Sequence, residues 1–316
     1  MREELTRWAA ERGYLAAWGP LELATAVQDE VARLGASGVL EKEFYASEVG
    51  SLAGTQVGRE PGLATVLMVV KPRPAHTVSF DLDGRRLEAV LPPTYVRYRP
   101  MFDDVAADLQ ADPLRGSRIE RLTAPLKPLA ARLGLVRYGR NNVTYAPGLG
   151  SYIQLLGYLT DAPLPLPDGW RPQAPALLPE CEGCGACRAV CPTGAVAEDR
   201  VLLHAERCLT YVNEKPGPWP AFVPARAHRC LLGCLLCQRA CPANPKLPLE
   251  SAGVEFNREE TEALLADTGD HLAPVWDGVR AKLERLGQPY SEAVIGRNLQ
   301  ALVAAARLRC SPRPGR

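Results

Sequence analysis

Cys181-Glu-Gly-Cys184-Gly-Ala-Cys187-Arg-Ala-Val-Cys191-Pro192 is the stretch that decides the architecture of this chain. A second run, Cys234-Leu-Leu-Cys237-Gln-Arg-Ala-Cys241-Pro242, has a related pattern. Nine of the ten cysteines fall between Cys181 and Cys241, and none precedes residue 181. Two-residue gaps let one tight loop present several thiolates to one centre. The crowding therefore marks a local metal site.

The spacing C-x2-C-x2-C-x3-C-P is that of bacterial ferredoxins, in which the cysteine before proline ligates the other of two clusters. Paired C-x2-C motifs also bind zinc, but a proline after the last cysteine of both runs favours iron-sulfur clusters. The sequence therefore predicts two [4Fe-4S] clusters. Exchange of the last ligands assigns Cys181, Cys184, Cys187 and Cys241 to cluster 1, and Cys191, Cys234 and Cys237 to cluster 2.

Spacing leaves the fourth ligand of cluster 2 open, because Cys208 and Cys230 both precede the second run. We favour Cys208, which lies in a separate segment, whereas Cys230 is only four residues from Cys234. Cys230 and Cys310 are expected to be ordinary free thiols, since lone cysteines behave as small apolar residues.

Composition excludes several classes of protein. The 37 Lys and Arg residues nearly balance 36 Asp and Glu residues, which argues against a surface that grips nucleic acid everywhere. The longest apolar run, Leu63 to Val70, is too short to span a bilayer, and no membrane partner is expected. The N-terminus mixes charges where a signal peptide would have a basic start and an apolar core. We therefore expect a cytoplasmic protein, in a compartment where disulfides are rare.

A proline-rich segment, Leu164 to Pro175, separates an N-terminal region from the cysteine runs. Apolar periodicity predicts a buried strand over 63–70 and a hairpin over 78–90 that turns at Asp83-Gly84. Helices are expected over 3–12, 21–34, 102–109, 125–133, 258–265, 272–286 and 291–308, the last three as a cap over the clusters. These elements predict an α/β or α+β fold with domains at 1–170, 171–248 and 249–316.

Between Arg115 and Arg140 the chain has seven basic residues and one acid, Glu120. This basic block is interpreted either as a solvated helix face or as a platform for an anionic group, such as a cofactor phosphate or a nucleic-acid backbone.

Several stretches resemble epoxyqueuosine reductases and, more distantly, reductive dehalogenases. They are both Cys-Pro runs, Arg207-Cys-Leu-Thr-Tyr-Val-Asn-Glu214, Ala131-Arg-Leu-Gly-Leu-Val-Arg-Tyr-Gly-Arg-Asn-Asn142, Gly150-Ser-Tyr152, Leu159-Thr-Asp-Ala-Pro-Leu164 and Arg297-Asn298. The resemblance runs from about residue 60 to 305. It implies an α+β chain with a nitroreductase-like N-terminal α/β domain that holds a corrinoid (cobalamin), a two-[4Fe-4S] ferredoxin-like module and C-terminal helices. It also supports Cys208 over Cys230.

The sequence departs from that family at its catalytic aspartate. The aligned residue is Leu122, in Arg121-Leu-Thr-Ala-Pro125. An expected Asp-Tyr-His is replaced by Met101-Phe-Asp103, and an expected Gly-Lys-Asn by Gly139-Arg-Asn141. A general acid needs only reach and a suitable pKa, so the candidate proton donors are Glu120, Tyr98 and Tyr138, with Tyr95 as a further possibility.

For the corrinoid, the matched stretch offers Arg140, Asn141, Thr144, Gly150 and Ser151 as candidate contacts. The alternative is that the glycines are turn residues and the asparagines cap a loop. Tyr138, Tyr145 and Tyr152 are equally interpreted as core aromatics, and the four histidines lack ligand spacing.

The resemblance implies a cobalamin-dependent iron-sulfur oxidoreductase that receives electrons from an external donor such as ferredoxin or flavodoxin. Because the catalytic aspartate is absent, we expect a small-molecule substrate rather than the usual tRNA nucleoside. One alternative is an electron-transfer or cobalamin-handling protein without its own substrate. Another is an epoxyqueuosine reductase that uses a different acid. A dehalogenase is disfavoured because the chain begins without a twin-arginine signal.

Overall fold

The computed structural model describes residues 1–54, 62–266, 274–288 and 292–310. The chain forms two compact units, each assembled from separate stretches. Unit 1 comprises Met1–Arg73, Arg99–Gly185 and Pro242–Pro245, and unit 2 comprises Pro74–Tyr98, Ala186–Cys241 and Lys246–Arg316. The three consecutive domains expected at 1–170, 171–248 and 249–316 stay a prediction.

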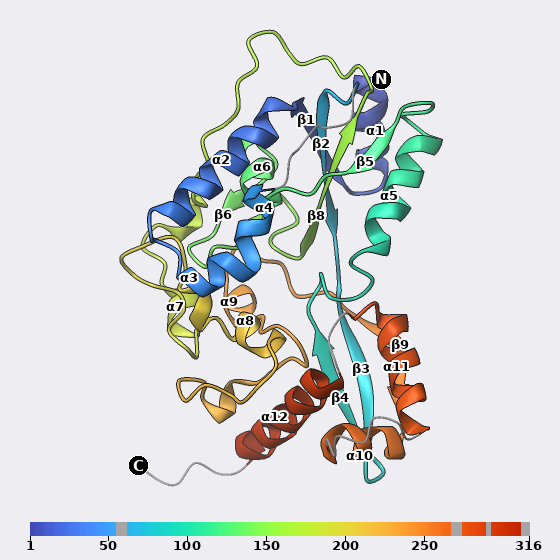
Figure 1. Cartoon of the computed structure of the whole chain (residues 1–316), viewed down its shortest axis with the longest axis vertical. Coiled ribbons are helices and arrows are strands. Elements are labelled where there is room, and N and C mark those ends of the chain that lie inside the picture. The colour runs from blue at the N-terminus through green and yellow to red at the C-terminus, as the bar shows by residue number, and fades with distance from the viewer. Residues whose placement is uncertain (55–61, 267–273, 289–291, 311–316) are drawn as a thin grey trace. The chain divides into compact units, whose positions relative to one another are not determined.

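A four-stranded antiparallel sheet forms the centre of unit 1 (Figure 1). Its order is β1 (Leu15–Pro20), β2 (Thr65–Pro72), β8 (Ile153–Thr160) and β5 (Ile119–Arg121). The central pair runs from Thr65 opposite Thr160 to Pro72 opposite Ile153. The strand expected over 63–70 is confirmed as β2. Its five consecutive buried residues, 66–70, reflect side chains that are covered on both faces of the sheet.

Helices cover both faces of this sheet. The helices of unit 1 are α1 (Arg2–Glu11), α2 (Glu22–Ala36), α3 (Lys42–Phe44), α4 (Gly50–Gly54), α5 (Pro100–Ala111) and α6 (Leu126–Arg132), with a π-helical turn at Tyr45–Val49. The four helices expected in this region are confirmed as α1, α2, α5 and α6. Gly134 follows α6 with a φ of +78°, a left-handed conformation that ends a helix.

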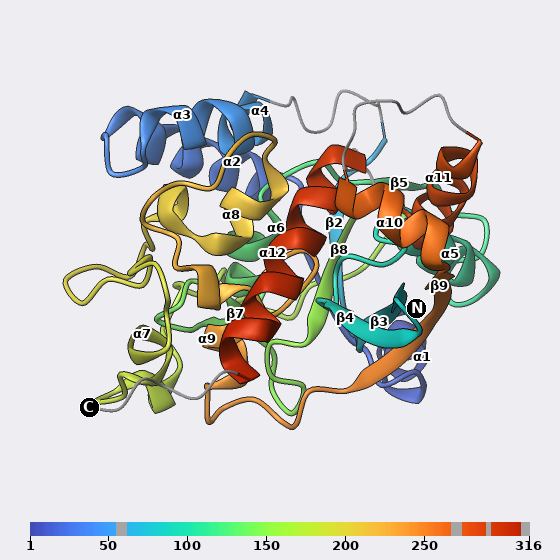
Figure 2. The ribbon, with the colours of Figure 1, turned by 90° about the horizontal axis from the view of Figure 1, so that it is seen from below.

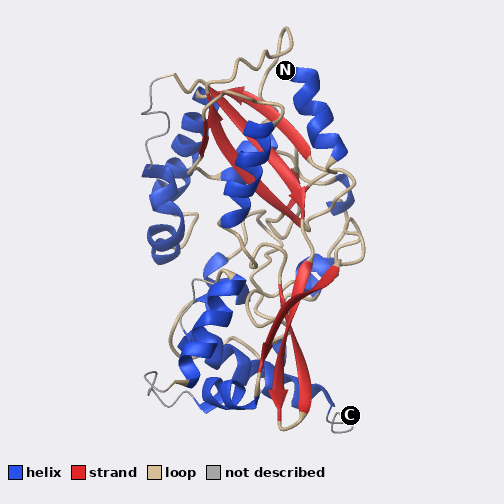
Figure 3. Cartoon of the chain, turned by 90° about the vertical axis from the view of Figure 1, so that its right-hand side faces the viewer, coloured by secondary structure: helices blue, strands red, loops and turns tan. Residues whose placement is uncertain are grey.

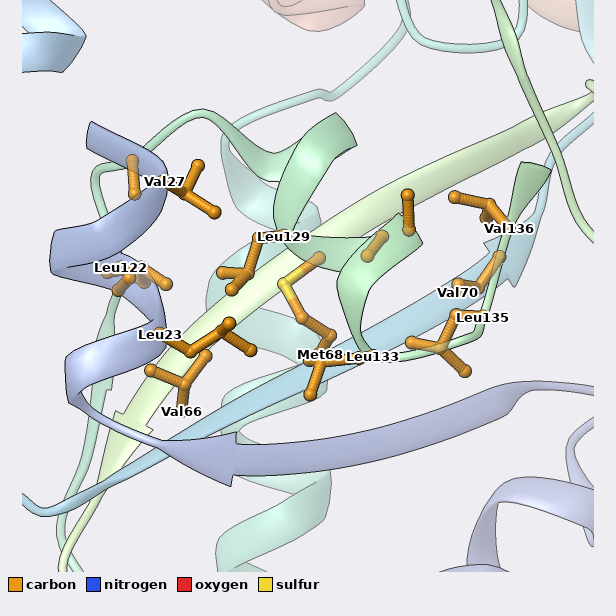
Figure 4. Close-up of a cluster of buried hydrophobic side chains, with 14 of the residues drawn as sticks. Leu23, Val27, Val66, Met68, Val70, Leu122, Leu129, Leu133, Leu135 and Val136 are labelled. Carbon is orange, nitrogen blue, oxygen red and sulfur yellow. The ribbon is translucent and has the colours of Figure 1, made fainter. Parts of the chain in front are cut away.

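One face of the sheet carries the main core of unit 1. Val66, Met68 and Val70 of β2 point toward α2 and α6 (Figure 4). On the other face, Phe102 of α5 packs edge to face on Tyr158 of β8, with ring centroids 6.1 Å apart. The Tyr158 hydroxyl also donates to the Phe102 carbonyl at 2.9 Å. These contacts fix a layer of helices on each side of the sheet.

Unit 2 contains a three-stranded sheet in the order β4 (Arg85–Leu91), β3 (Ala75–Leu82) and β9 (Leu249–Phe256) (Figure 3). Asp83 and Gly84 have φ values of +57° and +77°. Two consecutive positive φ values are typical of the tight turn that joins hairpin strands, so the expected hairpin is confirmed. β9 joins in parallel to β3, and Phe80 and Phe256 stack with centroids 4.8 Å apart.

The C-terminal helices of unit 2 are α10 (Arg258–Ala266), α11 (Val275–Leu286) and α12 (Glu292–Cys310). They are confirmed where they are described; residues 272, 273 and 291 of the expected ranges lie outside the described part. α10 packs on β3 and α11 on β9, burying an apolar core with this sheet. α12 contacts the cysteine segment at the turn Ala225–Ala227 and at α8 (Leu209–Glu214) (Figure 2). A cap over the clusters stays a prediction.

The rest of unit 2 is the cysteine segment, with the short helices α7 (Ala186–Ala189), α8 and α9 (Leu236–Arg239). In the part of the chain that the structure describes, no helix is both long enough and apolar enough to cross a membrane. The fold as a whole is a mixed α+β fold.

Candidate metal centre

The two cysteine runs are copies of one local structure. Cys184, Cys187 and Cys191 precede Cys234, Cys237 and Cys241 by 50 residues each. Cys187 lies in α7 and Cys237 in α9, and these helices pack on each other in unit 2. Each copy ends in the same turn, with the Cys191 N–H donating to Arg188 O and the Cys241 N–H to Gln238 O. Leu231 occupies the place that matches Cys181, so the second copy takes its fourth thiol from elsewhere.

The Cys191 sulfur accepts several hydrogen bonds. Burial alone would raise the pKa of the Cys191 thiol, but backbone N–H groups of Val196 and Thr193, the Thr193 hydroxyl and the backbone N–H of Ala195 lower it below its usual value. Backbone donors directed at a sulfur stabilise a thiolate and are a common way of tuning iron-sulfur clusters.

Cys208 stands at the N-terminal end of α8. Burial raises the pKa of its thiol, although the Thr210 and Tyr211 backbone N–H groups and the Thr210 hydroxyl direct hydrogen bonds at the sulfur and oppose that rise. Burial also raises the pKa of Cys234 to about 12, and the nearby thiols of Cys230, Cys208 and Cys191 add to the effect. The thiols of Cys191, Cys208, Cys230 and Cys234 are therefore near one another within unit 2.

Cys230 is placed differently from the other three. Its side chain is 4% exposed, and its Sγ donates to the carbonyl of Cys234 at 3.4 Å. Burial raises the pKa of this thiol to about 12. A sulfur that donates a hydrogen bond is protonated, whereas a cluster ligand is a thiolate. Cys230 therefore differs from Cys191 and Cys208, whose sulfurs accept hydrogen bonds. The side chain of Cys310 lies outside the described part.

Two buried asparagine side chains, Asn213 and Asn298, connect α8, which follows Cys208, with the residue before Cys234 and with α12. Sequence reasoning missed these two residues. Asn213 of α8 bonds Gly233, the residue before Cys234, and Asn298 of α12 bonds Asn213. Both asparagines lie in stretches that carry the family resemblance. That was the available signal, but nothing in the sequence indicates that the two would meet.

In unit 1, the loop that contains Arg140 contacts a predicted ligand of cluster 1. The Arg140 backbone N–H donates to the Cys181 sulfur at 3.4 Å. Asn141 is 2% exposed, donates from Nδ2 to the Tyr145 hydroxyl at 3.0 Å, and accepts from the Val143 N–H at 3.3 Å. Asn141 thus closes its own turn, and Thr144 is buried beside it in β7 (Thr144–Tyr145), which pairs with β6 (Arg137–Tyr138).

Gly150 and Ser151 are held against the segment that follows Cys241. Gly150 has a φ of +67°, and an added Cβ would lie 2.5 Å from Asn244 Oδ1. The Ser151 N–H donates to Asn244 Oδ1 at 2.7 Å, and Asn244 Nδ2 donates to Ser151 Oγ at 2.8 Å. These contacts hold the loop against Asn244 and Pro245 within unit 1. A corrinoid contact by any of the five residues stays a prediction.

The candidate proton donors have different surroundings. Glu120 of β5 pairs with Arg118 at 2.7 Å, and its side chain is 41% exposed. Tyr138 packs against the core of unit 1, and burial raises the pKa of its phenol well above the usual value. Tyr98 is half-buried in unit 2, where the Tyr95 hydroxyl contacts the Glu214 carboxylate. Their catalytic roles stay predictions.

Leu122, at the position where an acid was expected, is part of the hydrophobic core of unit 1. It is 3% exposed, and Figure 4 shows it among the side chains of α2, β2 and α6. Its backbone N–H donates to Gly157 O of β8 at 2.9 Å. The side chain of residue 122 therefore performs a packing role in this unit.

The basic block does not form one helix face, because its members lie on β5, α6, β6 and the intervening loops. Arg132 pairs with Glu30 at 2.6 Å, and Arg121 lies over the Phe102 ring, 4.0 Å from its centroid. Lys127 donates to the Asn142 carbonyl at 3.2 Å. Several of its charges thus serve contacts inside unit 1.

Comparison with known proteins finds a matching domain model, similar sequences and a similar fold. Residues 180–244 match the model of the 4Fe-4S double cluster binding domain. Epoxyqueuosine reductase of Salmonella typhimurium is 36% identical over 129 residues, covering 39% of this chain and 30% of that protein. The Staphylococcus aureus enzyme is 28% identical over 163 residues, covering 48% of this chain and 41% of that protein. The sequence matches thus span less than half of these relatives.

Solved structures extend the likeness to the fold. The Bacillus subtilis epoxyqueuosine reductase, with its catalytic aspartate loop swung out of the active site, superposes with a TM-score of 0.61 and 20% identity, covering 96% of this chain and 81% of that one. An epoxyqueuosine reductase with a modified tRNA-Tyr stem loop gives 0.61 and 19%, covering 96% and 80%. In its double-cluster segment, in part of its sequence and in its fold, the chain is therefore similar to epoxyqueuosine reductases.

Proposed function

We propose that the chain is an iron-sulfur oxidoreductase that holds two [4Fe-4S] clusters and a corrinoid. The observation that carries this proposal is the match of residues 180–244, which contain both cysteine runs and Cys208, to a double-cluster domain. Cluster 1 is assigned to Cys181, Cys184, Cys187 and Cys241. Cluster 2 is assigned to Cys191, Cys208, Cys234 and Cys237.

The donor set fits such clusters. Among the described residues, the eight thiols assigned to the clusters form no disulfide, and several of their sulfurs receive backbone N–H groups. When bound, [4Fe-4S] clusters supply one-electron transfer, and donors to their sulfurs and their exposure set the potential. The backbone of residues 193–196 and 210–211 would therefore stabilise the negative charge of cluster 2. An external carrier such as ferredoxin or flavodoxin is proposed to deliver the electrons.

A nitroreductase-like unit 1 is proposed to bind the corrinoid near Arg140, Asn141, Thr144, Gly150 and Ser151. Within unit 1, the hydrogen bonds from Arg140 to Cys181 and from Ser151 to Asn244 hold this loop, and the bond from Asn141 to Tyr145 closes its turn. When bound, a corrinoid supplies low-valent cobalt, a strong reductant and nucleophile, while the protein supplies position and a proton donor.

The test is reconstitution. Protein purified without oxygen is supplied with iron, sulfide and cobalamin and passed through a gel-filtration column. We expect iron, sulfide and the absorption spectrum of a bound corrinoid to elute with the chain. Iron without a corrinoid spectrum would remove the corrinoid from the proposal and keep the clusters.

For the substrate, Leu122 favours a small molecule over the usual tRNA nucleoside, because no carboxylate stands at this position. A solved structure with a similar fold contains a tRNA stem loop, which supports the alternative of a tRNA substrate. In that alternative, Glu120 or a tyrosine acts as the acid. Nucleoside analysis of tRNA from cells that lack the gene separates them. We expect unchanged epoxyqueuosine; its accumulation would show that the tRNA is the substrate.

Leu122 also favours a second candidate, an electron-transfer or cobalamin-reducing protein without a substrate of its own. This role keeps the eight cluster cysteines and has no need of an acid. It predicts that the purified chain reduces cobalamin for a partner enzyme and that activity requires that partner.

A further inference from the structure

We propose that Asn213, held by Arg297 and Asn298 of α12, is the positioning residue that brings Cys208 to cluster 2 as its fourth ligand. This inference rests on the proposed cluster and concerns a part of it that the cysteine spacing leaves open. Cys208 is 26 residues from Cys234, so a contact other than local chain geometry must hold the two together.

That contact is a pair of reciprocal hydrogen bonds between the Asn213 side chain and the Gly233 backbone. Asn213 Nδ2 donates to Gly233 O at 2.7 Å, and the Gly233 N–H donates to Asn213 Oδ1 at 3.1 Å. Asn213 is 1% exposed, so water does not compete for these bonds. One amide thus satisfies both backbone groups of the residue before Cys234, while α8 begins directly after Cys208.

Gly233 is shaped for this role. Its φ is +67°, and an added Cβ would lie 2.6 Å from Pro92 Cγ. Two residues earlier, the Leu231 N–H donates to Val90 O at 2.8 Å, which fixes the segment to the end of β4. Asn213 therefore bonds a backbone that has contacts of its own with Pro92 and Val90.

α12 fixes the other side of Asn213 (Figure 2). Asn298 Nδ2 donates to Asn213 O at 2.8 Å, and Arg297 Nη2 donates to the same carbonyl at 3.1 Å. Carbonyls in the last turn of a helix lack partners within the helix, so these donors complete the end of α8. Arg297 is itself held, with its guanidinium 4.1 Å from the Trp219 ring centroid and Nη1 donating to Gly217 O at 2.6 Å.

A positioning role predicts an effect on one cluster alone. Asn298→Ala removes the Asn298 donor to Asn213 O and also the Oδ1 that accepts from Arg297 Nε and Nη2. Trp219 and Gly217 still hold Arg297, so the chain should fold while α8 loosens. Loss of the one hydrogen bond from Asn298 to α8 corresponds to about a tenfold change in an equilibrium. We expect half of the iron to be released to a chelator about tenfold faster than in the wild type, and the other half at the wild-type rate.

In Asn213→Ala, half of the iron should again be released faster than the other half, and the increase in release rate should be larger than in Asn298→Ala. The matched control is Gln300→Ala on the same helix, whose amide donates to Leu265 O of α10 at 2.6 Å and not to α8. The reduction potential of each cluster, followed by electron paramagnetic resonance, is the second readout. Only one of the two potentials should move in Asn298→Ala, and neither should move in the control.

Equal acceleration of both halves, or wild-type release in both asparagine variants, would overturn the positioning role. Wild-type protein that retains no iron after reconstitution would overturn the proposed clusters as well. The failure of the inference alone is therefore recognised by a wild type with two clusters and variants with unchanged release.

Discussion

The cysteine segment of unit 2 keeps the residues that carry the family resemblance, whereas the core of unit 1 around Leu122 departs from the family pattern. In the cysteine segment, the residues that carry the resemblance lie together, and backbone N–H groups point at their sulfurs. Around Leu122, the residue that departs from the pattern is packed among α2, β2 and α6. The first region holds the proposed cluster ligands, and the second has apolar packing where an acid was expected.

The cysteine segment concerns the proposed route of electron transfer, whereas the Leu122 position concerns the proposed substrate. Ligand spacing constrains the cysteine segment tightly, because one displaced thiol leaves a cluster incomplete. The Leu122 position is constrained only by the space around it, where any apolar side chain of similar volume can pack. Both observations fit the proposal of two clusters together with a substrate other than the tRNA nucleoside.

The largest expected effect tests which thiol completes cluster 2. Cys208→Ser should lose half of the iron and acid-labile sulfide, because serine replaces a thiolate ligand. Cys230→Ser is the matched variant and should keep both clusters, since its thiol donates to a carbonyl. Iron and sulfide assays on the two reconstituted proteins decide the matter. Retention by Cys208→Ser together with loss by Cys230→Ser would reverse our assignment.

The next effect tests whether residue 122 is core or a vacated catalytic position. Leu122→Asp should destabilise the chain by about 3 to 5 kcal/mol, because it buries a carboxylate without a partner. The control, Leu122→Met, should cost less than about 1.5 kcal/mol, as volume-conserving apolar changes do. Denaturant unfolding followed by tryptophan fluorescence gives both values. Equal stability of the two variants would mean that the site accepts an acid.

A smaller effect concerns the glycine before Cys234. Gly233→Ala should cost about 2 kcal/mol and lower iron retention, because the new methyl group meets Pro92 and the backbone is left-handed. Gly253→Ala is matched, with a φ of +66° and no atom within 4 Å of the added Cβ. It should cost about 1 kcal/mol and keep both clusters. The idea fails if iron retention falls alike in both variants.

The smallest effect is on the pH dependence of stability. Burial, Arg297 and Arg309 lower the pKa of His228 to about 4, against an ordinary value of 6.5. The unfolded chain therefore binds a proton that the folded chain does not, and stability falls as the pH drops from about 6.5 toward 4. Between pH 7 and pH 5 the wild type should lose about 1 to 2 kcal/mol more than His228→Gln. Parallel pH profiles of thermal stability would contradict this.

Much of the fold followed from sequence patterns, and the failures have a physical reason. Helices with apolar periodicity and the Asp83-Gly84 hairpin are confirmed because their signals are local. The sequence did not indicate β1, β8 or β9. Leu15–Pro20 contains Ala, Gly and Pro, which are poor strand formers, and it is a strand because it pairs with β2. β9 pairs with β3, about 170 residues earlier, and no local pattern reports such a contact.

In the candidate site, too, the local features could be predicted from the sequence and the long-range contacts could not. Cysteine spacing is a local property, so the two runs could be recognised from sequence. The link from Asn213 to Gly233 and Asn298 joins residues 20 and 85 positions apart, and only the tertiary structure brings them together. The packing of Leu122 likewise depends on α2, α6 and β2, three separate segments of unit 1.

The most direct test of the central claim is the metal content of the chain purified without oxygen and before any reconstitution, measured with its electron paramagnetic resonance spectrum after reduction. Two [4Fe-4S] clusters predict about eight iron and eight acid-labile sulfide atoms per chain and signals from two neighbouring clusters. Stoichiometric zinc without sulfide, or iron for a single cluster, would contradict the account.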